Sequence, residues 1–271
     1  MKKSRRILGL EFCTENVDKI VELVINEQVL NTLNEDKLSS PQQPHPSREL
    51  QLLVTPNVDH VVTMTKDPQF KELCQNAWLL TADGFPVVKL LRYCDVDIPG
   101  RITGADLFPA IMDRLTVDVH SPFFVCSSTQ TAEFLSDWLR KNGFSSAEQR
   151  VVVPDFGFEN DPAYNQQLIQ QINALDTTHL FFGVGAPKSE KWMYTHRNEL
   201  PNMLGFGFGA GLDFFAGVKK RAPLWVQNIK MEWFWRLSSE PKRLAKRYLI
   251  NSWVFLGVAL KEMKQHKRDF G

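Results

Sequence analysis

Short apolar runs alternate with segments of helical periodicity along most of this 271-residue chain, and this alternation limits the fold more than any other feature. It is typical of βαβ units, in which parallel strands are buried beneath helices. The runs that predict strands lie at 50–55, 77–81, 123–126, 150–153, 180–184 and 203–208. Helices are expected from about 58, from 85, and over 129–141, 164–175 and 189–199. The sequence therefore predicts an α/β fold, with a parallel sheet flanked by helices.

A further strand at 7–12 and an amphipathic helix at 17–33 precede these units and complete one predicted α/β domain, residues 1–218. Residues 34–49 are rich in Pro, Ser and Gln and lack periodicity, which indicates a mobile surface loop. Such a loop is either a lid or a tolerated insertion. Residues 219–271, called the appendage below, show helical patterns only, with breaks expected at Pro223 and Pro241.

The appendage differs from the rest of the chain in charge. It carries 13 Lys and Arg against 4 Asp and Glu, a net charge of +9, whereas residues 1–218 carry 19 against 27, a net charge of −8. It also holds four of the seven tryptophans: Trp225, Trp233, Trp235 and Trp253. Within it, residues 248–260 are largely apolar and lie between basic clusters, too short to span ~30 Å of hydrocarbon. This pattern favours a helix lying in a membrane interface; packing on the α/β domain is the alternative.

Several classes of protein are excluded. The 43% apolar content is enough for a full core, and neither a spanning apolar run nor a signal-peptide core is present, so we expect a cytoplasmic protein. The four cysteines lack CxxC spacing and the six histidines lack zinc-site spacing, which predicts reduced thiols and neither a metal nor a cofactor. Asp95 and Asp97 form a DxD pattern, but it follows a helix and indicates a solvated loop. No nucleic-acid-binding motif accompanies the basic appendage.

Unusual residues collect just after four of the predicted strands. They are Thr55–Asn57, Asp83–Gly84, residues 183–188 and residues 209–213. Ligands of open parallel sheets bind outside the carboxyl ends of the strands, where helix N-termini present free amides. The four junctions therefore predict one binding cleft.

Each of these residues also has an ordinary structural explanation. Asp83 is either a helix N-cap or a general base, and Thr55 and Asn57 either cap a helix or hold ligand hydroxyls. Small residues and Lys188 in the 183–188 loop suit a phosphate or a sugar, although the P-loop spacing is absent. The alternating glycines at 205–211 do not form GxGxxG and follow the last strand, which disfavours a nicotinamide dehydrogenase.

Six blocks of the sequence, in their order and spacing, resemble the WecG/TagA/CpsF family of bacterial glycosyltransferases, glycosyltransferase family 26. They are VTPNVDHVV, TADGFPVVKL, GRITGADLFP, GVGAPKSEKW, GFGAGLDFFAG and KKRAPLWVQNIKMEWFWRLSSEPKRL. The match extends from residue 50 to about residue 250. It implies a Rossmann-like α/β body with a helical C-terminal appendage, a fold of the GT-E type.

The same resemblance implies an inverting, metal-independent transfer of a sugar in surface polysaccharide synthesis. The donor would be a UDP-sugar, of N-acetylmannosamine, glucose or glucuronate type, and the acceptor a sugar linked to polyprenyl diphosphate. The enzyme would sit peripherally on the inner face of the cell membrane, with the appendage meeting the membrane surface. The alternative is a non-catalytic sugar-nucleotide-binding protein tethered to a membrane beside another enzyme. Linkage position and oligomeric state stay open.

The resemblance also implies roles for individual residues. Asp83 would be the general base, Thr55 and Asn57 would line a sugar site, and Ser189 stands where the family usually has a substrate-contacting glutamine. The shorter hydroxyl weakens the expectation of the family's best-known donor, UDP-N-acetylmannosamine. The remaining expected binding residues are Gly84, Arg101, Gly185, Lys188, Gly209, Asp213, Arg236, Arg243, Lys246 and Arg247. The cations among them would neutralise the diphosphate, although Arg101 suits a structural ion pair equally well, and Asp213 suits packing or capping.

Overall fold

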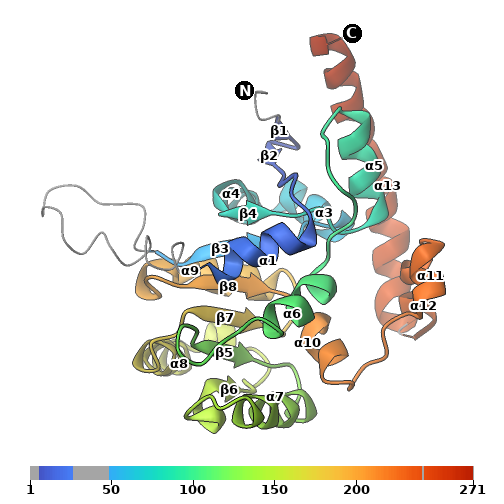
Figure 1. The fold of residues 1–271 in the computed structure, drawn as a ribbon. Helices are drawn as coiled ribbons and strands as arrows, with labels where there is room; N and C mark the ends of the chain where they lie inside the picture. Colours follow the sequence, from blue (N-terminus) through green and yellow to red (C-terminus); the bar gives the residue numbers. More distant parts are fainter. Residues whose placement is uncertain (1–5, 27–48, 240, 271) are drawn as a thin grey trace, which may run out of the picture.

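The computed structural model describes residues 6–26, 49–239 and 241–270, and its centre is a six-stranded sheet (Figure 1). All pairings in this sheet are parallel, in the order β4-β3-β8-β7-β5-β6. The strands are β3 (Gln51–Val54), β4 (Leu79–Leu80), β5 (Pro122–Val125), β6 (Val151–Val152), β7 (His179–Phe182) and β8 (Leu204–Gly207). The predicted Rossmann-like α/β fold is thus confirmed; four strands lie inside their predicted ranges, and β5 and β7 each begin one residue earlier than predicted.

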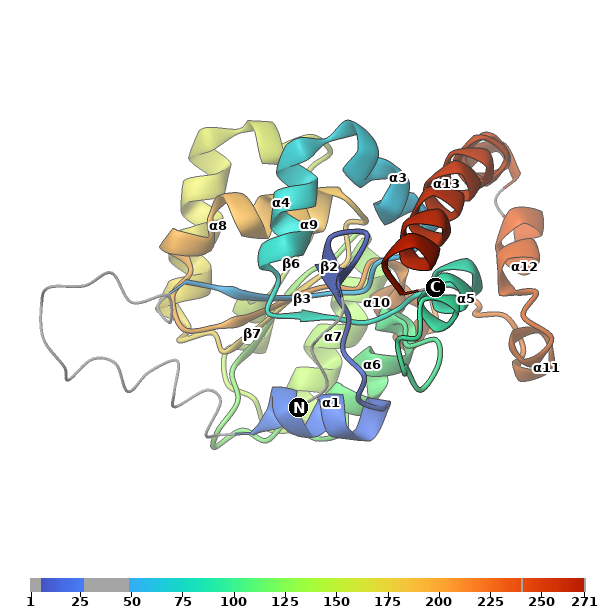
Figure 2. The ribbon, with the colours of Figure 1, turned by 90° about the horizontal axis from the view of Figure 1, so that it is seen from above.

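Helices cover both faces of the sheet (Figure 2). On one face lie α3 (Val58–Lys66), α4 (Pro68–Asn76), α8 (Pro162–Ala174) and α9 (Lys188–Thr195). On the other lie α1 (Val17–Ile25), α6 (Gly104–Met112), α7 (Thr129–Lys141) and α10 (Ala210–Phe215). α5 (Phe85–Tyr93) follows β4, and 3-10 turns occupy Ala147–Arg150, Phe158–Asn160 and Arg197–Glu199. The chain thus turns to one face of the sheet after β3 and β7, and to the other face after β5 and β8. Where neighbouring strands lead to opposite faces, the carboxyl edge of a parallel sheet is left open for a ligand.

The core consists of apolar side chains from the two faces of the sheet. Phe181 of β7 lies at its centre, with its ring stacked 5.3 Å from that of Phe124 and 4.7 Å from that of Phe206. All four cysteines are free thiols, as expected, and burial raises the pKa of Cys74 to about 12. Such thiols are unreactive at neutral pH.

Several helices begin where the sequence provides a cap. Asn57 accepts hydrogen bonds from the backbone N–H groups of Asp59 and His60 at the start of α3. Asp161 caps α8, in which Pro162 occupies the first turn, and Thr103 forms a capping box with Asp106 at the start of α6. These caps satisfy backbone N–H groups that have no partner inside the helix.

Some expected elements differ from the structure. The strand expected at 7–12 is a small hairpin of β1 (Arg6–Ile7) and β2 (Leu10–Glu11), because the chain turns at Leu8 and Gly9, both at positive φ. The helix expected at 17–33 begins at Val17 but ends at Ile25, where Asn26 adopts an extended backbone. Residues 27–33 and all of the expected 34–49 loop except Glu49 lie outside the described residues. α4 and α6 were not anticipated, and the helix expected at 189–199 divides into α9 and a 3-10 turn.

After α10, the described chain is helical: α11 (Leu224–Asn228), α12 (Glu232–Ser239) and α13 (Pro241–Phe270). α13 runs past α3 and α5 (Figure 1). It buries Phe255 and Ala259 in the core. Its Asn251 donates to Asp59 Oδ1 of α3 at 2.7 Å, and its Glu262 accepts from the N–H of Leu8 at 3.1 Å. One side of α13 therefore packs on the α/β body. In the described part of the chain, no helix has both the length and the apolar content needed to cross a bilayer.

A buried histidine at the start of β7 predicts a pH dependence of folding stability. Burial, and next the nearby His120, lowers the pKa of His179 from 6.5 to about 3. The unfolded chain therefore binds a proton between these values while the folded chain does not, so stability falls on acidification by up to about 1.4 kcal/mol per pH unit below 6.5. In an NMR titration from pH 8 to 5, the imidazole signal of His179 should not shift; a midpoint near 6.5 would contradict the assignment.

Candidate active site

The four sequence junctions meet at the carboxyl edge of the sheet in two pairs. In the first pair, the N–H of Asp83 donates to the carbonyl of Pro56 at 3.0 Å, so the loops after β3 and β4 lie against each other. In the second, the N–H of Gly209 donates to the carbonyl of Phe182 at 3.1 Å, which holds the start of α10 at the end of β7. The expected grouping of the junctions at one edge is therefore what the fold produces.

Asp83 lies half-buried between β4 and α5. The N-cap residue of α5 is Gly84, at φ +89°, and this cap has no side-chain hydrogen bond. The N-cap position of α5 is therefore held by Gly84 and not by Asp83. The carboxylate of Asp83 lies close enough to Arg101 to act on its pKa: burial lowers the pKa of Arg101, but the charges of Glu232, Asp83 and Asp106 more than offset this and raise it.

Thr55 and Asn57 follow β3 beside this carboxylate. Thr55 is buried, whereas Asn57 is half-buried and caps α3 through its side-chain oxygen. A Cβ atom placed on Gly84 would lie 3.8 Å from the Cβ of Asn57, so the DG and TPN motifs are in van der Waals reach. Of these two residues, Asn57 is the more exposed.

The loop of residues 183–188 joins β7 to α9. Gly185 has φ +93°, a backbone conformation that side chains rarely adopt, and the space its Cβ would occupy is open. Lys188 pairs with Glu159 at 3.0 Å, and its ammonium lies 4.8 Å from the centre of the Phe156 ring. Ser189 is fully buried and donates its hydroxyl to the carbonyl of Gly185 at 3.1 Å. The Ser189 side chain therefore stabilises the 183–188 loop through this hydrogen bond.

Asp213, at the start of α10, is also buried. Its carboxylate accepts hydrogen bonds from the hydroxyl of Thr131 at 2.7 Å, the hydroxyl of Ser127 at 3.2 Å and the ammonium of Lys219 at 2.7 Å. These contacts join the loop after β5 to the first residue of the appendage. These contacts agree with the structural explanation of Asp213, in which its side chain packs inside the protein.

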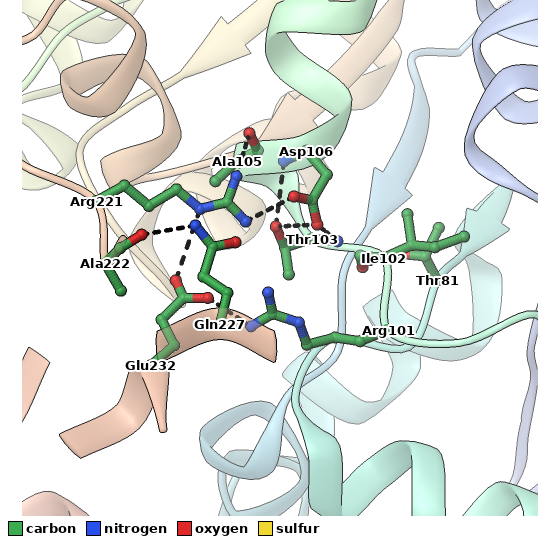
Figure 3. A network of polar contacts seen from close by, with 10 residues as sticks. All are labelled: Thr81, Arg101, Ile102, Thr103, Ala105, Asp106, Arg221, Ala222, Gln227 and Glu232. Atoms are coloured by element: carbon green, nitrogen blue, oxygen red, sulfur yellow. Dashed lines mark hydrogen bonds and ion pairs between the residues drawn. The ribbon is translucent and has the colours of Figure 1, made fainter. Parts of the chain in front are cut away.

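An ion-pair network connects the appendage to the α/β body (Figure 3). Arg101 donates to Glu232 of α12 at 2.7 Å, and Arg221 donates to Asp106 of α6 at 2.6 Å. The Nε atom of Arg221 lies 3.8 Å from Glu232, whose side chain is only 8% exposed. Glu232 therefore stands between two guanidinium groups, and Arg101 forms the structural ion pair that the sequence left as one of its two possibilities.

Cations of the appendage lie along the same edge. Lys230 extends over the ring of Phe85, next to Gly84, with its ammonium 4.1 Å from the ring centre. Arg236 belongs to α12, and Arg243, Lys246 and Arg247 belong to the start of α13, but their side chains lie outside what the structure describes. On the backbone, Arg247 precedes Asn251 by about one helical turn, and Asn251 contacts the first turn of α3.

Sequence reasoning did not assign roles to Lys219, Arg221, Lys230 or Glu232, nor to a buried pair formed by His60 and Glu190 at 3.4 Å. The first four lie inside the last of the six motif blocks, His60 lies inside the first and Glu190 inside the fourth, so their presence in these blocks was the available signal. The DxD pattern lies away from this edge, after α5, where both aspartates are exposed and Asp95 lies 3.2 Å from His266 of α13.

We compared the sequence with models of protein families and with known proteins. The sequence model described as "Glycosyl transferase WecG/TagA/CpsF family" matches residues 28–269. The chain is also similar to two proteins named N-acetylglucosaminyldiphosphoundecaprenol N-acetyl-beta-D-mannosaminyltransferase, from Staphylococcus aureus strain MW2 and strain NCTC 8325 / PS 47. Each is 26% identical over 220 residues, which cover 79% of this chain and 83% of the relative.

Proposed function

The chain belongs to the WecG/TagA/CpsF family of glycosyl transferases, as its sequence motifs predicted, and from this premise we propose that it transfers a sugar from a UDP-sugar, with inversion, to an acceptor linked to polyprenyl diphosphate. The observation that carries the proposal is the position of Asp83. Residue 83 is half-buried at the carboxyl edge of the sheet and is not the N-cap residue of α5; its N–H donates to Pro56 of the TPN loop, and its charge acts on Arg101.

In the proposed reaction, Asp83 removes the proton from the acceptor hydroxyl. The resulting oxygen attacks the anomeric carbon from the face opposite UDP, and the bond between that carbon and the diphosphate oxygen breaks. A single carboxylate that acts as a base, without forming a covalent intermediate, yields inversion. The open backbone face of Gly185 supports placing the donor over the loop after β7, opposite Asp83.

Departing UDP carries the charge of its diphosphate, which must be stabilised as the bond breaks. Lys188 at the start of α9, together with the N-terminus of that helix, supplies one set of positive groups. Arg101 lies by Asp83, and Lys230 lies over the ring of Phe85. Arg243, Lys246 and Arg247 belong to the part of α13 that precedes Asn251, which contacts α3. We propose that the appendage cations complete this diphosphate site, and that no metal or other cofactor takes part.

The donor sugar is left open by this site. The names of the two relatives state an N-acetylmannosaminyl transfer, which supports testing that sugar first. Ser189, however, is buried and bonded to Gly185, so it does not supply the contact expected of a glutamine at that position. Glucose and glucuronate donors therefore remain within the proposal.

We further propose that the appendage binds the surface of the cytoplasmic membrane, where a polyprenyl-linked acceptor resides. Among the described residues, sixteen large apolar side chains are exposed; nine of them belong to α11, α12 and α13, and a tenth, Ile229, is the C-cap residue of α11. We call these the apolar appendage surface: Leu224, Trp225, Ile229, Trp233, Phe234, Leu249, Ile250, Trp253, Leu256 and Leu260. Exposed apolar groups beside many cations are typical of helices that lie in an anionic interface.

The test is an assay of UDP release with a panel of UDP-sugars. The purified full chain is incubated with UDP-N-acetylmannosamine, UDP-glucose or UDP-glucuronate, with and without polyprenyl-diphosphate N-acetylglucosamine. We expect one donor to release UDP only when the acceptor is present. If UDP-sugars bind but no donor gives acceptor-dependent release, the protein is a sugar-nucleotide-binding partner of another enzyme instead.

A further inference from the structure

A buried imidazole–carboxylate pair lies directly behind the TPN loop and has no part in the chemistry described so far. His60, in the first turn of α3, is 5% exposed, and Glu190, in the first turn of α9, is 1% exposed. His60 Nε2 lies 3.4 Å from Glu190 Oε1. The pair links helices that follow β3 and β7, two strands separated in the sheet by β8.

The intervening strand makes room for this pair. A Cβ atom on Gly207 of β8 would lie 2.6 Å from Glu190 Oε1, a distance that no real contact allows. The other oxygen, Glu190 Oε2, is buried and has no hydrogen-bond partner among the described residues. A buried carboxylate in such surroundings is costly unless the adjacent imidazole shares a proton with it.

The contacts of Asn57 decide where the protons of His60 lie. Asn57 Oδ1 accepts from the N–H groups of Asp59 at 2.9 Å and His60 at 3.2 Å, which identifies it as the oxygen. His60 Nδ1 lies 2.8 Å from the same oxygen and must therefore donate to it. The N–H of Asn57 approaches Nδ1 at 3.4 Å, which would need the opposite tautomer, but the shorter contact decides.

With Nδ1 protonated, the contact between His60 Nε2 and Glu190 can hold its proton in two ways. Either Nε2 carries the hydrogen, and the pair is an imidazolium and a carboxylate, or Glu190 is a neutral carboxyl group whose O–H donates a hydrogen bond to the lone pair of Nε2. Both arrangements contain one proton between Nε2 and Oε1, and both keep the Nδ1 hydrogen on Asn57. In both arrangements Glu190 holds the His60 ring in place through Nε2, while the contact with Asn57 determines that Nδ1 carries its hydrogen.

We propose that His60 and Glu190 are positioning residues that hold Asn57 as a hydrogen-bond donor to the substrate. Three donors occupy Asn57 Oδ1, so the amide cannot flip, and its NH₂ group is the end left for a ligand. Among the described residues, this NH₂ group makes no hydrogen bond. It suits an oxygen of the sugar or of the diphosphate, and the inference rests on the transferase function proposed above.

The test is a double-mutant cycle between His60→Phe and Asn57→Ser. Phenylalanine keeps the ring beside Phe70, 5.6 Å from His60, and serine keeps the helix cap while removing the NH₂ group. We expect His60→Phe to lower kcat/KM about tenfold in the natural chain, the effect of one lost hydrogen bond, and to have no further effect in the Asn57→Ser chain. Equal losses in both chains would show a merely structural histidine and would overturn the proposal.

Glu190 supplies a matched pair of variants. Glu190→Gln can donate its amide N–H to Nε2 and keep the Nδ1 hydrogen on Asn57, so it should retain most of the activity, whereas Glu190→Leu should match His60→Phe. A Glu190→Gln variant as impaired as Glu190→Leu would contradict the proposed tautomer.

One measurement does not depend on turnover. The ¹⁵N signals of the His60 imidazole, recorded without substrate, should show a protonated Nδ1; a neutral ring protonated only at Nε2 would overturn the positioning role. If this signal is as expected but the natural chain releases no UDP with any donor, the proposed transferase function fails and the arrangement of the three side chains stands.

Discussion

Replacement of Asp83 by asparagine should lower kcat on the order of 10²–10⁴-fold, the usual contribution of a general base. Asparagine has nearly the same shape but cannot accept a proton from the acceptor hydroxyl. The backbone of residue 83 should not move, because its N–H still donates to Pro56 and the cap of α5 is Gly84. Folding stability should therefore change little, and the loss of activity should lie in the chemical step.

Binding of UDP separates this prediction from a general loss of function. Removal of a negative charge near Arg101 should leave UDP affinity unchanged or slightly increased, as measured by calorimetry. Asp97→Asn is the matched control, because Asp97 is exposed in the loop after α5 and should leave turnover unchanged. Near-normal turnover by Asp83→Asn would remove Asp83 from the reaction, and loss of UDP binding would point to a donor-binding role.

The second large effect concerns the membrane. Serine substitutions at Leu224, Leu249 and Trp253, which are 75%, 69% and 74% exposed, should lower the partition of the protein onto anionic vesicles about 10²–10³-fold. The estimate takes about 3–4 kcal/mol for three apolar side chains partly withdrawn from water. Because these side chains pack on little in the protein, the thermal unfolding midpoint should stay within about 2 °C of its original value.

The activity of the triple serine variant should depend on whether the acceptor is in a membrane. With acceptor embedded in vesicles, the triple variant should lose activity, whereas with a water-soluble short-chain acceptor it should equal the natural chain. Val117→Ser provides the control, since Val117 is 45% exposed on the α/β body, just after α6. If vesicle binding by the triple variant were unchanged, the apolar appendage surface would serve some purpose other than membrane contact.

Much of the fold was readable from the sequence, because hydrophobic periodicity is a local property of the chain. All six strands were located, but two helices were missed. α4 is a nine-residue helix with only three buried side chains, and α6 starts at Gly104 and contains Pro109, residues that usually mark loops. The small hairpin at the N-terminus was taken for one strand, because the turn at Leu8 and Gly9 interrupts an otherwise apolar run.

The candidate site was predictable in its location but not in its internal contacts. Parallel strands bring their carboxyl ends to one edge, so the four junctions had to meet once the sheet was recognised. What each polar residue does there depends on partners that lie far away in the chain. Arg101 and Glu232 are 131 residues apart, and His60 and Glu190 are 130 residues apart.

From its sequence alone, this protein is an α/β transferase with a basic, tryptophan-rich appendage, because strand and helix patterns and motif spacing are properties of short segments. Only the tertiary structure decided that Gly84, not Asp83, is the N-cap of α5, that Asp213 and Ser189 are buried, and that Asn57 caps α3 with its side-chain oxygen. The physical reason is that a polar side chain is committed by the hydrogen bonds it makes, and those are set when distant segments pack together.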